Sequence, residues 1–255
     1  MQLYSKILGE GDQHLIIMHG VFGSGDNWQT LGRKWSETYC VHLLDMRNHG
    51  KSPHSDAFSY ELMSDDLQEY MEAHHIEKAL ILGHSMGGKV GMLFAVLNPE
   101  RVEKLVVADI APKPYKPHHQ KIIAALQSLD LETINSRGDA EEAFGPEIEE
   151  EGTRQFLLKS LYWKEKGKLD WRFNVPVIAR EIKKVGDALP PNAIYSGETL
   201  FVRGGKSWYI QDEDEEMILD HFPGARLEAI DGAGHWLHAE KPKEFFELVS
   251  SFLES

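Results

Sequence analysis

Ser85 lies in a segment whose residue types and spacing suit nucleophilic catalysis. The run Ala79-Leu80-Ile81-Leu82 is continuously apolar, which is typical of a strand buried on both faces of a parallel sheet. It leads through Gly83-His84-Ser85-Met86-Gly87 into a helix that we expect to run to about Leu97, before Pro99. A G-x-S-x-G turn between a strand and a helix holds its serine in a strained conformation with the hydroxyl exposed. The pattern therefore predicts a nucleophilic Ser85, and a plain tight turn is the alternative.

A serine hydroxyl becomes a good nucleophile only when a base removes its proton, and His235 is the best candidate for that base. It lies in the loop Asp231-Gly232-Ala233-Gly234-His235, just after the last expected strand. Catalytic groups of open parallel sheets collect at the carboxyl ends of the strands. The nearby His238 is interpreted as structural. The pairs His74-His75 and His118-His119 have no carboxylate or cysteine at ligand spacing, so we interpret them as surface residues.

The acid that orients the histidine has two candidate places in the chain. Asp109 directly follows an apolar strand pattern, and the later place, after the expected strand from Thr199 to Val202, holds Ser207. A serine can hydrogen-bond an imidazole but cannot stabilise its charged form electrostatically. We therefore assign Asp109 as the acid and Ser207 as an auxiliary hydrogen-bonding partner of the histidine. In the alternative assignment, Asp212 or Asp214 reaches the histidine.

Backbone amides are expected to stabilise the oxyanion of the reaction. The N–H of Met86, directly after the nucleophile, supplies one donor, and the loop His19-Gly20-Val21-Phe22 supplies the second. Each donor of this kind typically contributes about 2.7–4 kcal/mol to transition-state stabilisation. The sequence leaves open whether Val21 or Phe22 presents the second amide. We expect His19 to brace this loop.

The elements that position these residues alternate between strands and helices, which predicts a mostly parallel sheet flanked by helices. From residue 112 to residue 191 the periodicity becomes helical, with no convincing buried strand. We predict a core of residues 1–111 and 192–255 and a helical cap of residues 112–191. The candidates for substrate binding are aromatic and basic residues of the cap and of the segment near Ser207: Tyr115, Trp163, Trp171, Trp208, Arg203 and Lys206. Core packing for the aromatic residues and solvated surface for the basic ones are the alternatives.

The charge and composition limit the classes of partner. The chain of 255 residues has a net charge of -14, which argues against nucleic acid and anionic membranes. Its first residues lack a signal-peptide pattern and no apolar run could span a bilayer, so we expect a soluble, cytoplasmic protein. The single cysteine, Cys40, is interpreted as a buried core thiol. We expect no metal, no cofactor, and a monomer or homodimer that acts on a small molecule.

Four motifs together resemble the α/β-hydrolase superfamily: HGVFGSGDNW at 19–28, DMRNHGKS at 45–52, GHSMGG at 83–88 and GAGH at 232–235. Within it, VADIAP at 107–112, together with Ser207 in place of the usual late acid, resembles the small YbfF-type esterase branch. In that branch the acid follows the strand before the cap, which supports Asp109. The resemblance implies hydrolysis of short- to medium-chain acyl esters, or of thioesters such as acyl-CoA, without a cofactor.

Other activities stay open because a fold does not fix its chemistry. The same scaffold and triad also serve C–C bond hydrolases, perhydrolases and lyases. A protein that binds a ligand without turnover is the alternative from a different class, and an intact set of Ser85, His235 and Asp109 argues against it.

Overall fold

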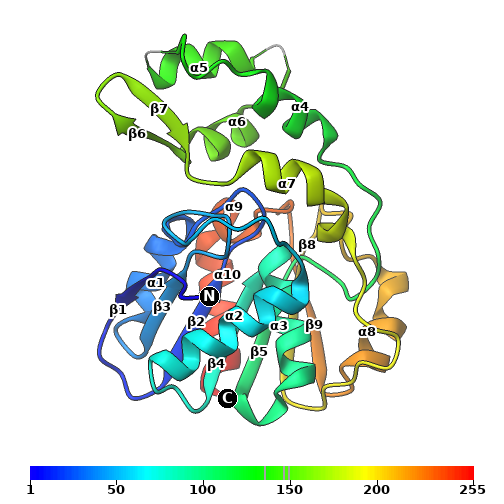
Figure 1. The fold of residues 1–255 in the computed structure, drawn as a ribbon. Helices are drawn as coiled ribbons and strands as arrows, with labels where there is room; N and C mark the ends of the chain where they lie inside the picture. Colours follow the sequence, from blue (N-terminus) through cyan, green and yellow to red (C-terminus); the bar gives the residue numbers. More distant parts are fainter. Residues whose placement is uncertain (135, 146, 149) are drawn as a thin grey trace.

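The computed structural model describes residues 1–134, 136–145, 147–148 and 150–255. One sheet contains β1 Ser5–Leu8, β2 His14–Met18, β3 Cys40–Leu44, β4 Ala79–His84, β5 Val102–Ala108, β8 Thr199–Gly204 and β9 Ala225–Ile230. The spatial order is β1-β3-β2-β4-β5-β8-β9 (Figure 1). Every neighbouring pair is parallel except β1 with β3, which is antiparallel. The predicted mostly parallel sheet is confirmed.

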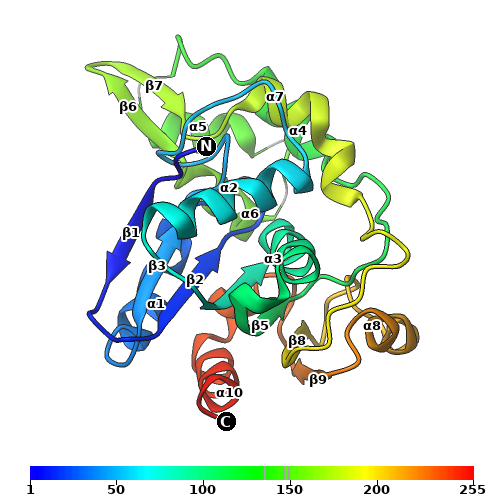
Figure 2. The ribbon, with the colours of Figure 1, turned by 60° about the horizontal axis from the view of Figure 1, so that its bottom comes forward.

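Helices cover both faces of this sheet, and this explains why its central strands are apolar throughout. The core helices are α1 Gln29–Trp35, α2 Tyr60–Ala73, α3 Met86–Leu97, α8 Glu215–His221, α9 Leu237–Glu240 and α10 Pro242–Glu254. Short 3-10 helices lie at Gly25–Trp28, Pro99–Arg101, Ile182–Gly186 and Asp212–Asp214. Residues of α2 and α3 belong to one hydrophobic cluster, and residues of α1 and α10 belong to the other. Figure 2 shows α10 on the opposite side of the sheet from α2.

The segment 112–191 lies beyond the carboxyl edge of the sheet (Figure 1). It contains α4 Gln120–Ser128, α5 Arg137–Phe144, α6 Glu151–Leu158, β6 Leu161–Glu165, β7 Lys168–Trp171 and α7 Val175–Glu181. We call this segment the cap, and its assignment as a separate unit stays a prediction.

The cap is not wholly helical, which corrects the sequence interpretation. Leu161 and Tyr162 lie in the stretch where the sequence predicts helical periodicity, but α6 ends at Leu158 and both residues begin the antiparallel hairpin β6–β7. Gly167, with φ 81°, allows the tight turn between the two strands. Most of β6 is exposed, so the hairpin lacks the continuous apolar run that marks a buried strand.

The two chain segments that join the cap to the core run side by side and are held by a buried lysine. Tyr115 N–H donates to Gly186 O at 2.8 Å. Lys89 of α3, 1% exposed, donates from Nζ to Lys113 O and to Asp187 O, each at 2.7 Å. Burial lowers the pKa of Lys89 to about 7. Through its two hydrogen bonds, the Lys89 amino group fastens both ends of the cap to α3.

Replacing Lys89 by methionine is expected to lower the free energy of unfolding by about 1–3 kcal/mol, because it removes the two hydrogen bonds that the lysine donates to the Lys113 and Asp187 carbonyls. Urea unfolding of Lys89→Met measures this loss. Lys78→Met, which changes an exposed lysine, is the control and should unfold like the wild type. Equal stability of Lys89→Met and the control would show that the lysine does not hold the cap.

Among the described residues, none of the helices combines the length and the apolar character that a membrane crossing requires.

Candidate active site

Ser85 lies at the sharp turn between β4 and α3. Its backbone adopts φ 52° and ψ -116°, a region that residues other than glycine rarely occupy. A Cβ on Gly83 would lie 2.2 Å from Gly87 O, and one on Gly87 would lie 2.5 Å from Met18 O. Both positions therefore require glycine. The predicted strand–serine–helix geometry of this segment is confirmed.

Asp109 and His235 come together from the ends of β5 and of the loop after β9. His235 Nδ1 lies 2.7 Å from Asp109 Oδ2. The carboxyl group is fully buried, and it also accepts hydrogen bonds from Gly204 N–H, at 3.0 Å, and from the Ser207 hydroxyl. Burial raises the pKa of Asp109 above its ordinary value, and the bonds from Ser207 and Gly204 oppose that rise. Ser207 was expected to bond the imidazole, whereas in the structure it donates to the acid.

The alternative acids are engaged elsewhere. Asp212 is exposed and its Oδ1 lies 2.5 Å from Arg203 Nη2. Asp214 Oδ2 lies 2.5 Å from Lys113 Nζ and also accepts from Gln211 N–H at 2.8 Å. The geometry therefore favours Asp109 as the partner of the histidine.

The environment of His235 keeps its imidazole neutral and fixed in orientation. Its ring stacks on Tyr209, with centroids 3.8 Å apart and an interplanar angle of 12°. Its backbone carbonyl is 2.8 Å from His84 Nε2. Burial, followed by the nearby His118, lowers the pKa of His235 below its ordinary value. A neutral imidazole held at Nδ1 by a carboxylate has its other nitrogen free to act as a base.

The glycine-rich loop after β2 forms a tight turn in which Gly23 N–H donates to Gly20 O at 3.0 Å. Phe22 adopts φ 64°, and its N–H donates to His49 Nε2 at 3.2 Å. The part of the chain that the structure describes offers no acceptor to the N–H of Val21 or of Met86. These two amides are therefore free for a ligand, and that of Phe22 is not.

Two further histidines of the site contact other parts of the protein. His19 Nδ1 bonds Gly20 O at 2.7 Å, and its Nε2 accepts from Met46 N–H at 3.0 Å, so it braces the loop as predicted. His238 stacks on Trp28, with centroids 4.1 Å apart and an interplanar angle of 11°. This contact supports the structural interpretation of His238.

A cavity of about 450 Å³ opens over Ser85 between the core and the cap. Its apolar and aromatic wall residues come from both parts: Val21, Phe22, Ile122, Phe156, Leu157, Trp208, Tyr209 and Trp236. Its charged wall residues are Lys206, Glu150 and Glu240. Glu240 accepts from Gly234 N–H at 2.7 Å and thereby supports the loop that carries His235.

The structure brings only part of the predicted substrate-binding set to this cavity. Trp208 and Lys206 line it. Tyr115 lies outside, where its hydroxyl accepts from Ala111 N–H at 2.8 Å and donates to Tyr209 O at 2.6 Å. Tyr115 therefore supports the cavity wall from behind.

The other three members of that set lie away from the cavity. Trp163 is 53% exposed on the hairpin β6–β7. Trp171 stacks on Phe173 inside the cap, with centroids 5.2 Å apart. Arg203 pairs with Asp212 on the surface. Their residue types suggested binding, but the hairpin and the packing of the cap direct the two tryptophans elsewhere, and Asp212 engages Arg203.

His118 and His119 line the cavity, although the sequence indicated surface residues. His118 Nε2 hydrogen-bonds the hydroxyl of Tyr209, whose ring stacks on His235. His119 contacts Phe22 edge to face, with centroids 5.9 Å apart. Their position follows from how the cap packs on the core, for which the local sequence holds no signal.

A mostly parallel sheet with a strained serine after β4, an acid after β5 and a histidine after β9 defines an α/β-hydrolase. Residues 13–131 match the family model described as alpha/beta hydrolase fold. Esterase YbfF of Escherichia coli is 37% identical over 242 residues, which cover 94% of this chain and 92% of that protein. The chain therefore belongs to the α/β-hydrolase family.

Further relatives indicate the same type of enzyme. The mouse protein named sn-1-specific diacylglycerol lipase ABHD11 is 38% identical over 94% of this chain and 80% of its own length. A solved structure described as a marine microorganism esterase is 40% identical, covers 99% of both chains and has a TM-score of 0.96. These relatives support a hydrolase of the esterase and lipase type.

Proposed function

We propose that this protein hydrolyses carboxylic esters of small molecules, with short to medium acyl chains, through an acyl-enzyme on Ser85. The observation that carries the proposal is the 2.7 Å contact between His235 Nδ1 and the buried carboxylate of Asp109, beside a cavity that His235 and Ser85 both line. The esterase and lipase names of the relatives support the same class of substrate.

The reaction proceeds in two acyl-transfer steps. His235 Nε2 takes the proton of Ser85 Oγ as that oxygen attacks the ester carbonyl carbon. The N–H groups of Met86 and Val21 bind the oxyanion, and His235 then protonates the leaving alcohol. His235 next takes a proton from water, which attacks the acyl-enzyme, and returns that proton to Ser85 Oγ as the acid leaves. Asp109 holds the imidazole tautomer throughout.

Val21 is the proposed second oxyanion donor because the alternative amide is already used. The N–H of Phe22 donates to His49 Nε2. If this N–H bound a substrate instead, the buried imidazole nitrogen of His49 would have no donor. His49 is fully buried, and burial lowers its pKa to about 3, so its nitrogen stays an acceptor at neutral pH.

The walls of the cavity favour neutral oxygen esters over acyl-CoA thioesters. Among the described residues that line the cavity, Lys206 is the lysine that could attract an anion. Glu150 and Glu240 also line the cavity, and their negative charges would repel a polyphosphate. A volume of about 450 Å³ with mostly aromatic walls suits a short or medium acyl chain. Thioester cleavage, a cytoplasmic location and a monomeric or dimeric state stay predictions.

Hydrolysis of p-nitrophenyl acetate and butyrate, together with labelling by a serine-reactive phosphonate, tests the proposal. We expect turnover of both esters, slower turnover of butyryl-CoA, and one phosphonate per chain on the peptide that contains Ser85. Cleavage of diketones without cleavage of esters would favour a C–C bond hydrolase. The absence of both turnover and labelling would favour a protein that binds a ligand without catalysis.

A further inference from the structure

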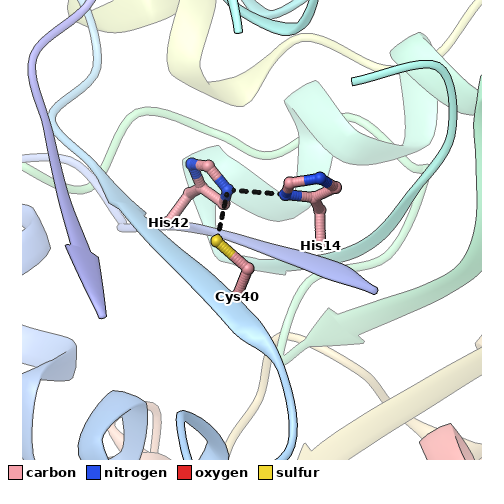
Figure 3. Close-up of side chains that lie close together, drawn as sticks. All are labelled: His14, Cys40 and His42. Atoms are coloured by element: carbon pink, nitrogen blue, oxygen red, sulfur yellow. Dashed lines mark hydrogen bonds between the residues drawn. The ribbon is translucent and has the colours of Figure 1, made fainter. Parts of the chain in front are cut away.

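Three side chains with metal-binding atoms lie together at the amino ends of β2 and β3 (Figure 3). His14 Nδ1 is 2.9 Å from His42 Nε2, and Cys40 Sγ is 3.5 Å from the same nitrogen. The three atoms all lie within 4.8 Å of one another. In the parallel register His14 pairs with Cys40, and His42, two residues further along β3, points to the same face of the sheet.

The spacing of these atoms approaches that of a tetrahedral zinc site. Zinc bonds of about 2.0–2.1 Å to nitrogen and 2.3 Å to sulfur place tetrahedral ligands about 3.3 Å apart for two nitrogens and 3.6 Å for nitrogen and sulfur. The observed 3.5 Å between Cys40 and His42 matches the second value. The 2.9 Å between His14 and His42 needs to open by only about 0.4 Å.

A hydrogen-bond chain behind His42 fixes the tautomer that a metal ligand needs. His42 Nδ1 lies 2.7 Å from Tyr70 Oη, and Tyr70 donates its hydroxyl proton to Ser5 Oγ at 2.7 Å. Since Tyr70 donates to Ser5, it accepts from His42 Nδ1–H. The lone pair of His42 then lies on Nε2, on the side of His14 and Cys40. Metal-binding histidines use second partners of this kind to orient the ring.

The cluster is partly buried and still accessible to an ion. His42 is 2% exposed, whereas His14 and Cys40 are half-buried, so an ion can approach from their side. Cys40 is therefore not the fully buried core thiol that the sequence indicated. The net charge of -14 also favours the approach of a cation.

We propose that His14, Cys40 and His42 bind one zinc-type divalent cation, with water in the fourth position. Binding replaces the proton of the Cys40 thiol by the metal and releases that proton to solvent. The proton that His14 Nδ1 shares with His42 Nε2 is displaced as well, and His14 becomes the tautomer protonated on its other ring nitrogen, Nε2. The site joins β2 to β3 at the end of the sheet opposite Ser85, so the ion stabilises the fold and takes no part in ester hydrolysis. The sequence offered no such indication because the ligands meet only through strand pairing.

Titration with Co²⁺ as a substitute for zinc tests the site. Cys40 is the only cysteine of the chain, so a thiolate-to-cobalt charge-transfer band in the near ultraviolet reports on this residue alone. We expect the band to saturate at one Co²⁺ per chain and to be absent from Cys40→Ser. His14→Ala should weaken Co²⁺ binding at least about tenfold. His54→Ala, which removes an exposed histidine elsewhere, is the control and should leave the affinity unchanged.

The wild type alone provides a second readout that does not depend on how the variants fold. Zn²⁺ should slow alkylation of Cys40 by iodoacetamide and raise the melting temperature, because the ion binds the folded state. No charge-transfer band at excess Co²⁺, unchanged alkylation with Zn²⁺, or equal affinity in His14→Ala would each overturn the proposal. The three side chains would then form a hydrogen-bonded cluster only.

Discussion

Ser85→Ala is expected to lower kcat for p-nitrophenyl butyrate by about 10⁴- to 10⁶-fold, because the alanine has no oxygen to form the acyl-enzyme. KM should change little, since the cavity walls and the free amides of Val21 and Met86 remain. The phosphonate adduct should disappear together with the activity. Steady-state kinetics and mass spectrometry of the labelled protein measure these effects.

The substitution removes the nucleophile without a new demand on the backbone. Serine and alanine both carry a Cβ, so the strain at φ 52° is the same in both proteins and stability should be nearly unchanged. Ser251→Ala, in the exposed part of α10, is the matched control and should keep wild-type kinetics. If Ser85→Ala retained more than about a tenth of kcat, an acyl-enzyme on this serine would be rejected.

The sequence predicted those residues of the active site whose positions depend on short stretches of the chain. Gly83 and Gly87 flank Ser85 because β4 and α3 pass too closely for side chains, and this spacing is visible in a short stretch of chain. Asp109 was predicted because it follows an apolar strand and because the other usual place holds Ser207. In the structure, these two residues share one hydrogen bond.

The parts that the sequence left open depend on contacts between distant segments. The choice between Val21 and Phe22 follows from His49, which lies 27 residues beyond Phe22 in the chain. His118 and His119 reach the cavity only because the cap folds back over the core. No local pattern of polarity or spacing encodes contacts of this kind.

The hairpin of the cap was missed for a different reason. Trp163 and its neighbours on β6 are exposed, so their sequence shows neither the continuous apolar run nor the alternation of a half-buried strand. Gly167 was the signal of a turn that the sequence did offer. Together with Lys166 it lies between two segments of similar length, which form the two strands of the hairpin. Leu161, fully buried at the start of β6, continued the helical spacing of Phe156 and Leu157 by coincidence.

Asp109→Asn is expected to lower kcat by about 10³- to 10⁴-fold, with a smaller change in KM. An amide in place of the carboxylate cannot stabilise the imidazolium of His235, and its NH₂ group favours the wrong tautomer of the ring. Asp212→Asn is the matched control: Asp212 pairs with Arg203 on the surface, so this variant should keep wild-type kinetics. Ser207→Ala should lower kcat by about tenfold or less, because it removes one of the hydrogen-bond donors to Asp109 and keeps the negative charge of that residue.

Misfolding is not expected to account for the loss in Asp109→Asn. Asp109 has φ 52°, and asparagine tolerates this left-handed conformation as well as aspartate does. The Oδ1 atom of asparagine can still accept from Gly204 N–H, so the thermal stability should stay close to that of the wild type. If Asp109→Asn were nearly as active as the wild type and Asp212→Asn were inactive, the acid that orients His235 would be Asp212, after the later strand β8. The esterase would then keep its serine and histidine, and the short contact at Asp109 would serve to hold the loop of His235.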